Sequence, residues 1–246
     1  MFNWFRKDKS SFLGLDSLQL DMHSHLLPGI DDGSRTMDET IALINKMVQL
    51  GYSHLITTPH IMHEVYPNTR DIIEGKLEEV RQEIERLKIP VSIHAAAEYY
   101  LDYNLIEEIG NKKLLTLGND FVLVEFGFVS PPVGSEELIF EMQSKGYKPI
   151  LAHVERYAYF FNDFKTIEQL RERGVALQLN ILSLTGHYGN EVKKQAEKLV
   201  DKELVDFLAT DCHRIQHLQL IEKNLSSKYI QRLLAKKLKN KSLLFD

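Results

Sequence analysis

Two histidines, His23 and His25, follow a short apolar run near the start of the chain and are separated by one residue. Residues two apart in an extended chain point to the same side, so the two imidazoles could bind one metal ion. One such pair gives weak support for a metal site, because a polar residue at a strand end is often structural. Its meaning depends on what the other strands carry.

Residues of the same chemical kind stand at the ends of nearly all the other apolar runs. Besides the first pair, they are His60, Glu98, Glu125, His153, Asp211 and His213. The carboxyl ends of the strands of a β/α barrel converge on one cavity. Charged or imidazole groups among apolar residues are costly unless they are paired or metal-bound. The pattern therefore predicts a metal centre built from strand ends.

The loop after the first pair, residues 26–33, is rich in turn residues and carries two more carboxylates. Asp32 is expected to join the metal ligands. Asp31 could join them or could cap the turn, and the spacing does not separate these roles.

The charge of these ligands indicates how many ions they would hold. Four are carboxylates, and the five histidines bind metals as neutral imidazoles. Three divalent ions and one hydroxide would leave the cluster slightly positive, which suits a phosphate ester, whereas two ions would leave it negative. The donors are oxygen and imidazole without thiolate, so manganese, iron and zinc all fit.

Arg156 follows His153 by three residues and is the predicted phosphate-binding residue. A guanidinium can donate two parallel hydrogen bonds to a phosphate. The alternative is a surface ion pair with Glu155 or a neighbouring residue. Arg35, near the first loop, could also face the site, but a solvated role is at least as consistent with its position. His63 or a metal-bound water could donate a proton to a leaving group, and Tyr66 could line the cavity mouth or pack at its rim; the sequence does not choose between these roles.

Cys212 is not expected to be a nucleophile, although it lies between two predicted ligands. Strand alternation turns its side chain away from the cavity. A cysteine-dependent phosphatase would need an arginine six residues later, where the chain has Leu218. His187 and His217, in loop or helix contexts, are expected to be structural or solvated.

The elements that must position these residues alternate between short apolar runs and longer amphipathic stretches. Strands are predicted at 18–22, 55–58, 91–97, 121–126, 149–153, 176–180 and 205–210, and helices at 37–50, 70–87, 135–145, 167–173, 192–200 and 215–224. Such alternation is typical of a parallel sheet. We therefore expect a single α/β domain, residues 1–246, folded as a distorted seven-stranded β/α barrel. An open doubly wound sheet is the alternative.

The composition limits the classes of protein to which the chain can belong. Of 246 residues, 43% are hydrophobic, which suits one sizeable core, and the net charge of -5 argues against nucleic-acid binding. A single cysteine, no signal peptide and no apolar run of about 20 residues indicate a cytoplasmic protein without membrane insertion.

The two ends of the chain are expected to lie outside the barrel. Residues 1–17 are expected to be an extension with a frayed start, and residues 226–246 a basic, solvated C-terminal helix or tail.

Together these motifs resemble the polymerase-and-histidinol-phosphatase superfamily. Within it they are similar to the bacterial manganese-dependent protein-tyrosine phosphatases of capsule and exopolysaccharide operons. The matching segments cover most of the chain in the family's order, and they are residues 23–33, 58–60, 97–98, 124–125, 153–157 and 209–213. The first is the most specific, because its Leu-Pro-Gly-Ile-Asp-Asp-Gly continuation separates this branch from relatives that share only His-x-His. Val154 departs from the family, which often has proline there.

The resemblance implies a distorted seven-stranded barrel that holds three divalent ions, manganese first, with iron or zinc as alternatives. One ion would take His23, His25, Glu98 and Asp211, a second Glu98, Glu125 and His153, and a third Asp32, His60 and His213. Arg156 would hold the substrate phosphate.

The activity implied is hydrolysis of phosphotyrosine on the tail of a membrane-linked bacterial tyrosine kinase that regulates capsular or exopolysaccharide synthesis. Two alternatives stay open. One is a small-molecule phosphatase such as a histidinol-phosphatase, and the other is a metal-binding regulatory module without turnover.

Overall fold

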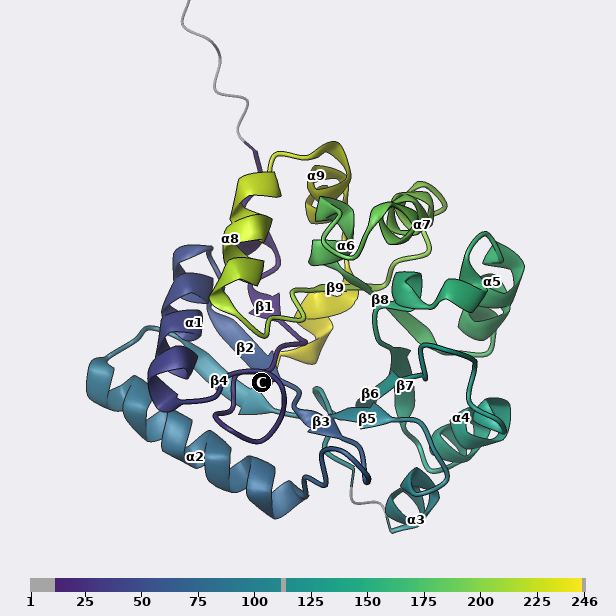
Figure 1. Ribbon diagram of the computed structural model, residues 1–246, viewed down its shortest axis with the longest axis horizontal. Helices are drawn as coiled ribbons and strands as arrows, with labels where there is room; N and C mark the ends of the chain where they lie inside the picture. The colour runs from purple at the N-terminus through teal and green to yellow at the C-terminus, as the bar shows by residue number, and fades with distance from the viewer. Residues whose placement is uncertain (1–11, 112–113, 245–246) are drawn as a thin grey trace, which may run out of the picture.

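Parallel strands form the wall of a barrel, and helices surround it (Figure 1). The computed structural model describes residues 12–111 and 114–244. The strands are β1 (Leu20–Asp21), β2 (His54–Thr57), β3 (His60–Ile61), β4 (Ser92–Ala95), β5 (Glu98–Tyr100), β6 (Phe121–Glu125), β7 (Lys148–Leu151), β8 (Ala176–Asn180) and β9 (Phe207–Ala209).

Nine strands are present among the described residues where seven were predicted, because β3 and β5 lie just beyond the predicted runs 55–58 and 91–97. β3 follows β2 after a break at Pro59, which has no N–H to donate to a ladder. β5 follows β4 after a second break. The backbone N–H of Ala96 donates to the carbonyl of Thr57, and that of Glu98 to the carbonyl of Pro59. These bonds carry the pairing across both breaks, from the sheet β1-β2-β4 to the sheet β3-β5-β6-β7-β8-β9.

The last strand returns to the first. Ser24 and Cys212 form an isolated parallel bridge, and the backbone N–H of Asp211 donates to the carbonyl of His23 at 2.9 Å. The prediction of a distorted β/α barrel is therefore confirmed, with nine short strands in the described part of the chain where seven were predicted. The open doubly wound sheet is excluded, because its two edge strands would not meet.

The helices lie outside the strands, and several of them begin at a residue whose side chain caps the first turn. They are α1 (Met37–Gln49), α2 (Arg70–Leu87), α3 (Leu105–Gly110), α4 (Ser135–Ser144), α5 (Phe164–Glu172), α6 (Ile181–Thr185), α7 (Asn190–Asp201), α8 (Ile215–Asn224) and α9 (Lys228–Ala235). Thr36 and Thr69 cap α1 and α2 with their side-chain oxygens. The six predicted helices are confirmed, whereas α3 and α6 were not predicted because they are too short to show a helical period.

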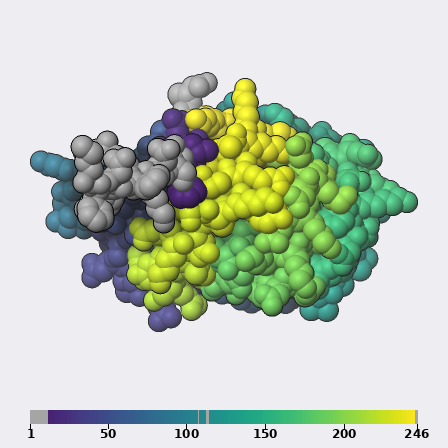
Figure 2. Space-filling view, turned by 90° about the horizontal axis from the view of Figure 1, so that it is seen from above, coloured from purple at the N-terminus to yellow at the C-terminus, as the bar shows by residue number. Residues whose placement is uncertain are grey.

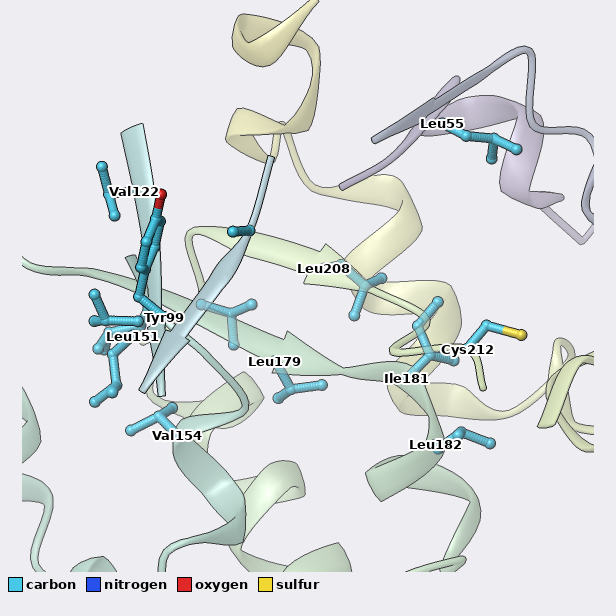
Figure 3. Close-up of a cluster of buried hydrophobic side chains, with 14 of the residues drawn as sticks. Leu55, Tyr99, Val122, Leu151, Val154, Leu179, Ile181, Leu182, Leu208 and Cys212 are labelled. Carbon is cyan, nitrogen blue, oxygen red and sulfur yellow. The ribbon is translucent and has the colours of Figure 1, made fainter. Parts of the chain in front are cut away.

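Alternation along the strands divides the side chains between two apolar clusters and the cavity. In β6, Val122 and Val124 belong to the large cluster between the strands and the helices, drawn in part in Figure 3. Leu123 belongs to a smaller cluster that fills the barrel. Two positions further along the same inward row stands Glu125. An inward row thus begins with apolar filling and ends with a ligand-type side chain.

The C-terminal segment is packed, and the expectation of a solvated tail is wrong. Ile230 and Leu233 of α9 are buried, and Leu243 lies in the cluster that fills the barrel. Asn240 is also buried, and its amide exchanges hydrogen bonds with the backbone of Leu208. The abundance of lysine in this segment concealed an apolar face of helical period.

The described part of the predicted N-terminal extension also packs against the barrel. Leu15 is fully buried, and the backbone of Leu13 exchanges hydrogen bonds with Gln231 of α9. Figure 2 shows this proximity, with the first described residues beside the C-terminal segment. The expectation of a frayed start falls on residues 1–9, which lie outside the described residues.

A buried carboxylate fixes the C-terminal segment to the barrel. Asp206 precedes β9 and is 3% exposed. It accepts hydrogen bonds from the guanidinium of Arg171 at 3.1 and 3.2 Å and from the backbone N–H of Leu177, and its carboxylate lies 2.9 Å from Nζ of Lys239. Burial alone would raise the pKa of Asp206, but the bonds from Arg171 and Lys239 outweigh it and lower that pKa.

We expect Asp206→Asn to destabilise the protein by about 1–2 kcal/mol near neutral pH, since charged hydrogen bonds are lost and both cations are half-exposed. A folded-state pKa below the unfolded value stabilises above the unfolded pKa, and that stabilisation disappears as the pH falls through the folded pKa. The gap between wild type and variant should therefore narrow below about pH 4. Urea unfolding at several pH values measures it, and a gap independent of pH would contradict this role.

Candidate metal centre

The predicted ligands come together around one cavity at the carboxyl ends of the strands. The cavity has a volume of about 390 Å³. Its lining includes the predicted phosphate-binding residue Arg156 and seven of the nine predicted metal ligands, namely Asp32, His60, Glu98, Glu125, His153, Asp211 and His213. His23 and His25 lie beneath this lining and are fully buried.

The first histidine pair points its Nε2 atoms at a common position. These two atoms are 3.3 Å apart, and each lies 3.3–3.5 Å from carboxylate oxygens of Glu98 and Asp211. The Nδ1 atoms are occupied elsewhere, that of His23 by Oε1 of Gln178 at 3.2 Å and that of His25 by Asp31 at 2.8 Å. Because Nδ1–H donates to these acceptors, the Nε2 lone pairs face each other, which a cation between them would stabilise.

Glu98 lies at the centre of the cluster. Its Oε2 is 3.2 Å from Nδ1 of His60, and its Oε1 is 3.1 Å from Nε2 of His153. The same histidine nitrogen lies 3.5 Å from Glu125. One carboxylate therefore faces imidazoles from three strand ends and could be shared between two ions.

An outer group of residues lies nearer the mouth. Asp32 is about half exposed, and its Oδ1 is 3.5 Å from Nε2 of His60 and 3.3 Å from Nε2 of His213. The Nδ1–H of His213 donates to the backbone carbonyl of Asp211 at 3.0 Å, which leaves Nε2 directed at Asp32. This arrangement again leaves an imidazole nitrogen free for a metal.

Three overlapping groups of side chains within the described residues are close enough to hold an ion each. They are His25, Asp32, His60 and His213; His23, His25 and Glu98; and His60, Glu98 and Glu125. The first group adds His25 to the predicted third set, and the last contains His60 where the predicted second set has His153. The nine predicted ligands are thus brought together, and their division among ions stays a prediction.

The electrostatics of the cluster favour bound cations. Burial and the neighbouring Glu98 carboxylate raise the pKa of Glu125 well above its ordinary value. Burial and the Arg156 cation lower the pKa of His153 to about 4, so this imidazole is neutral near pH 7, the form that binds metals. Closely spaced carboxylates repel one another when they are ionised, and bound divalent ions would offset that repulsion. The donor set therefore fits the metals that the sequence predicts.

Three polar residues position the ligands and were missed or left undecided by the sequence analysis. Gln178, inside β8, accepts from the backbone N–H of His153 as well as from His23. Asn180 donates from Nδ2 to Asp211 at 2.8 Å. Asp31 both accepts from the turn N–H of Gly33 and holds His25, so both roles considered for it are met. Polar side chains inside a buried strand were the available signal.

Two predicted ligands have unusual backbone conformations. His153 has φ of 32° and Asp211 has φ of 49°. Residues other than glycine rarely adopt positive φ, and such strain persists only where the surroundings enforce it. Both residues lie two positions past the end of a strand, β7 and β9, and both line the cavity.

Arg156 contacts the cluster and not Glu155. Its Nη1 donates to Oδ2 of Asp211 at 3.1 Å. Glu155 is buried on the other side, where its Oε1 accepts from the hydroxyl of Ser183 and the backbone N–H of Asn180. The alternative of a surface ion pair with Glu155 is therefore wrong.

The remaining side chains singled out in the sequence divide between core, cavity and rim. Cys212 is fully buried in the large apolar cluster, which Figure 3 shows, and burial raises its pKa well above the ordinary value. His187 and His217 line the cavity, so reading them as only structural or solvated was incomplete. Tyr66 stacks on His60, with ring centroids 5.4 Å apart. His63 lies 3.6 Å from Glu108, and Arg35 is exposed.

Residues 19–243 match the family described as "Capsular polysaccharide synthesis, CpsB/CapC". The chain belongs to this CpsB/CapC family. Among its relatives, a putative tyrosine-protein phosphatase CapC of Staphylococcus aureus is 30% identical over 84% of this chain and 81% of its own length. Tyrosine-protein phosphatase YwqE of Bacillus subtilis is 29% identical over 80% of this chain and 78% of its own.

Solved structures extend the comparison. One from a study of YwqE of Bacillus subtilis and CpsB of Streptococcus pneumoniae, described as unique metal-dependent tyrosine phosphatases, superposes with a TM-score of 0.76 at 27% identity. It covers 89% of this chain and 95% of its own. Histidinol phosphate phosphatase of Lactococcus lactis superposes with a TM-score of 0.53 at 15% identity, covering 85% and 93% of the two chains, which supports the fold alone. The CpsB/CapC fold is thus shared with metal-dependent phosphatases.

In this CpsB/CapC chain, Asp31→Ala should lower metal affinity about 10–100-fold, because it removes the carboxylate that orients His25. Asp31→Asn should lower it less, since an amide oxygen can still accept from Nδ1. Competition with a chromogenic chelator measures the affinity. Asp38→Ala, which removes an exposed carboxylate from the first turn of α1, is the matched control. Equal affinities for Asp31→Ala and this control would contradict the orienting role.

Proposed function

We propose that the protein is a metal-dependent phosphotyrosine phosphatase. The observation that carries the proposal is the convergence of nine ligand-type side chains and Arg156 around one cavity, in a chain of the CpsB/CapC family. Water adds to phosphorus, the bond from phosphorus to the tyrosine oxygen breaks, and that oxygen leaves with a proton. The relatives described as tyrosine phosphatases favour this reaction over a binding module without turnover.

We propose three divalent ions, with manganese as the native metal and iron or zinc as alternatives. His23, His25, Glu98 and Asp211 would hold one, Glu98, Glu125 and His153 a second, and Asp32, His60 and His213 a third. The oxygen and imidazole donors support this choice, since none of the donors is a thiolate. When bound, such ions lower the pKa of water and neutralise charge on a phosphoryl group.

Arg156 would bind the phosphoryl oxygens of the substrate. Its side chain is 22% exposed and lines the cavity, and its Nη1 donates to Asp211. The remaining N–H groups can therefore donate to a phosphate. Because Asp211 also faces His23, the phosphate-binding residue and the metal ligands are held by the same carboxylate.

We propose that the substrate is the phosphotyrosine tail of a membrane-linked bacterial tyrosine kinase, and that the enzyme acts in the cytoplasm. The family description concerns capsular polysaccharide synthesis, and its members are named tyrosine phosphatases. A flexible tail can reach ligands at a barrel mouth more easily than a tyrosine in a folded domain. Across residues 12–111 and 114–244, no helix is long and apolar enough to span a bilayer.

Exhaustive chelation should abolish phosphate release from a phosphotyrosine peptide, and added manganese should restore it, because water is a poor nucleophile without a bound cation. The same protein assayed on histidinol phosphate tests the small-molecule alternative. Full activity of the metal-free protein would exclude the proposal. Turnover of histidinol phosphate well above that of the peptide would identify the substrate as a small molecule instead.

Arg156→Ala should lower kcat/KM on the peptide by about 10²–10³, the usual effect of losing one preorganised donor to developing charge. Metal content should be kept, because Asp211 still accepts from Asn180. Arg156→Lys should rescue only in part, since an ammonium cannot donate in the same planar fork. His153→Ala is the contrasting variant and should lose metal as well as rate. If Arg156→Ala turns over at the wild-type rate, Arg156 does not bind the substrate phosphate.

A further inference from the structure

Two aromatic rings lie against the guanidinium of Arg156 at the cavity mouth. The Cζ atom of Arg156 is 4.8 Å from the ring centre of Phe128 and 4.3 Å from that of Tyr188. Both rings line the same cavity as the predicted ligands. They come from distant parts of the chain, Phe128 from the loop after β6 and Tyr188 from the loop after α6.

Each ring is held in place by contacts of its own. Phe128 lies 5.5 Å from Tyr157 and is stacked on His153 at 5.8 Å with an interplanar angle of 20°. The hydroxyl of Tyr188 accepts from Nδ2 of Asn180 at 3.3 Å. The loop that carries Tyr188 is bounded by Gly186 and Gly189, whose φ values of 89° and 95° allow the tight turn. The rings are therefore positioned before any substrate arrives.

A phosphoryl group bound by Arg156 would direct its ester oxygen toward the open side of the cavity. The group attached to that oxygen must leave past the residues around Arg156, which include both rings. Phe128 is still 43% exposed, so part of its surface is free to contact a ligand. An aromatic leaving group could stack on this ring, whereas a small alkyl group would leave the ring exposed to solvent.

We propose that Phe128 and Tyr188 form a binding wall for the phenyl ring of an aryl phosphate and thereby select aryl over alkyl monoesters. This inference rests on the proposed phosphatase function and adds the residues that determine its specificity. Neither residue is a metal ligand, and neither contributes a donor to the phosphate. Their contribution is to the binding of the part of the substrate that the metals do not contact.

A purely structural role makes a different prediction. If the rings only hold Arg156, removing one should weaken every phosphate or phosphonate by the same factor. If they form the wall, the loss should be confined to ligands that carry an aromatic ring. Benzylphosphonate, propylphosphonate and inorganic phosphate separate the two cases, because none of them contains a hydrolysable ester.

The experiment measures the dissociation constants of these three ligands by calorimetry on the metal-loaded protein. Phe128→Leu and Tyr188→Leu should each weaken benzylphosphonate about 3- to 10-fold, the equivalent of one lost aromatic contact. Propylphosphonate and phosphate should bind as in the wild type. Phe128→Tyr and Tyr188→Phe keep a ring and should restore benzylphosphonate affinity. Phe140→Leu, at an exposed phenylalanine of α4 that does not line the cavity, is the matched control.

Equal weakening of all three ligands would overturn the inference and leave the rings as supports of Arg156. Unchanged benzylphosphonate affinity in both leucine variants would also overturn it. Metal content and the urea midpoint of each variant establish that it is folded and loaded. Failure of the proposed function looks different, because wild-type protein would then not hydrolyse a phosphotyrosine peptide whatever the ratio of phosphonate affinities.

Discussion

The carboxylate of Glu98 is the group about which the structure is organised. It lies within 3.5 Å of four histidines from three strand ends, namely His23 and His25 after β1, His60 at β3 and His153 after β7, and it is almost completely buried. A buried charge in such company is unfavourable without positive charge nearby. β3 and β5, which follow the two breaks, bring His60 and Glu98 side by side as partners in one parallel pair.

Along several strands, the inward-facing side chains change from apolar at one end of the barrel to polar at the cavity end. In β9 the row passes from Phe207 and Ala209 in the apolar filling to Asp211 in the cavity. In β8 it passes from Ala176 to Gln178 and Asn180, which hold His23, His153 and Asp211. Apolar filling at one end keeps the wall rigid. Polar side chains at the other end then sit on strands, which place them more accurately than loops would.

Much of this could be predicted from the sequence because its signals are local. The strand-end positions of His23, Glu125, His153 and Asp211 follow from short apolar runs, and their convergence follows from parallel topology. What could not be predicted depends on distant contacts. The bonds of Gln178, the left-handed backbone at His153 and the packing of α9 arise from residues far away in the chain. Phe128 and Tyr188 carry no signal at all until the fold brings them to Arg156.

The hydrogen bonds of Asn240 bear on the order in which the chain folds during its synthesis. Its amide donates to the backbone carbonyls of Leu20 and Leu208, so residues 220 positions apart meet at the foot of the barrel. The pairing of the first and last strands is equally non-local, and contacts of this kind form late and slowly. During synthesis, His23 and Glu98 leave the ribosome long before Asp211 and Asn240 do. Seven of the nine predicted ligands thus precede β9 in the chain, and the cluster is complete only when the strand that precedes Asp211 and His213 has paired.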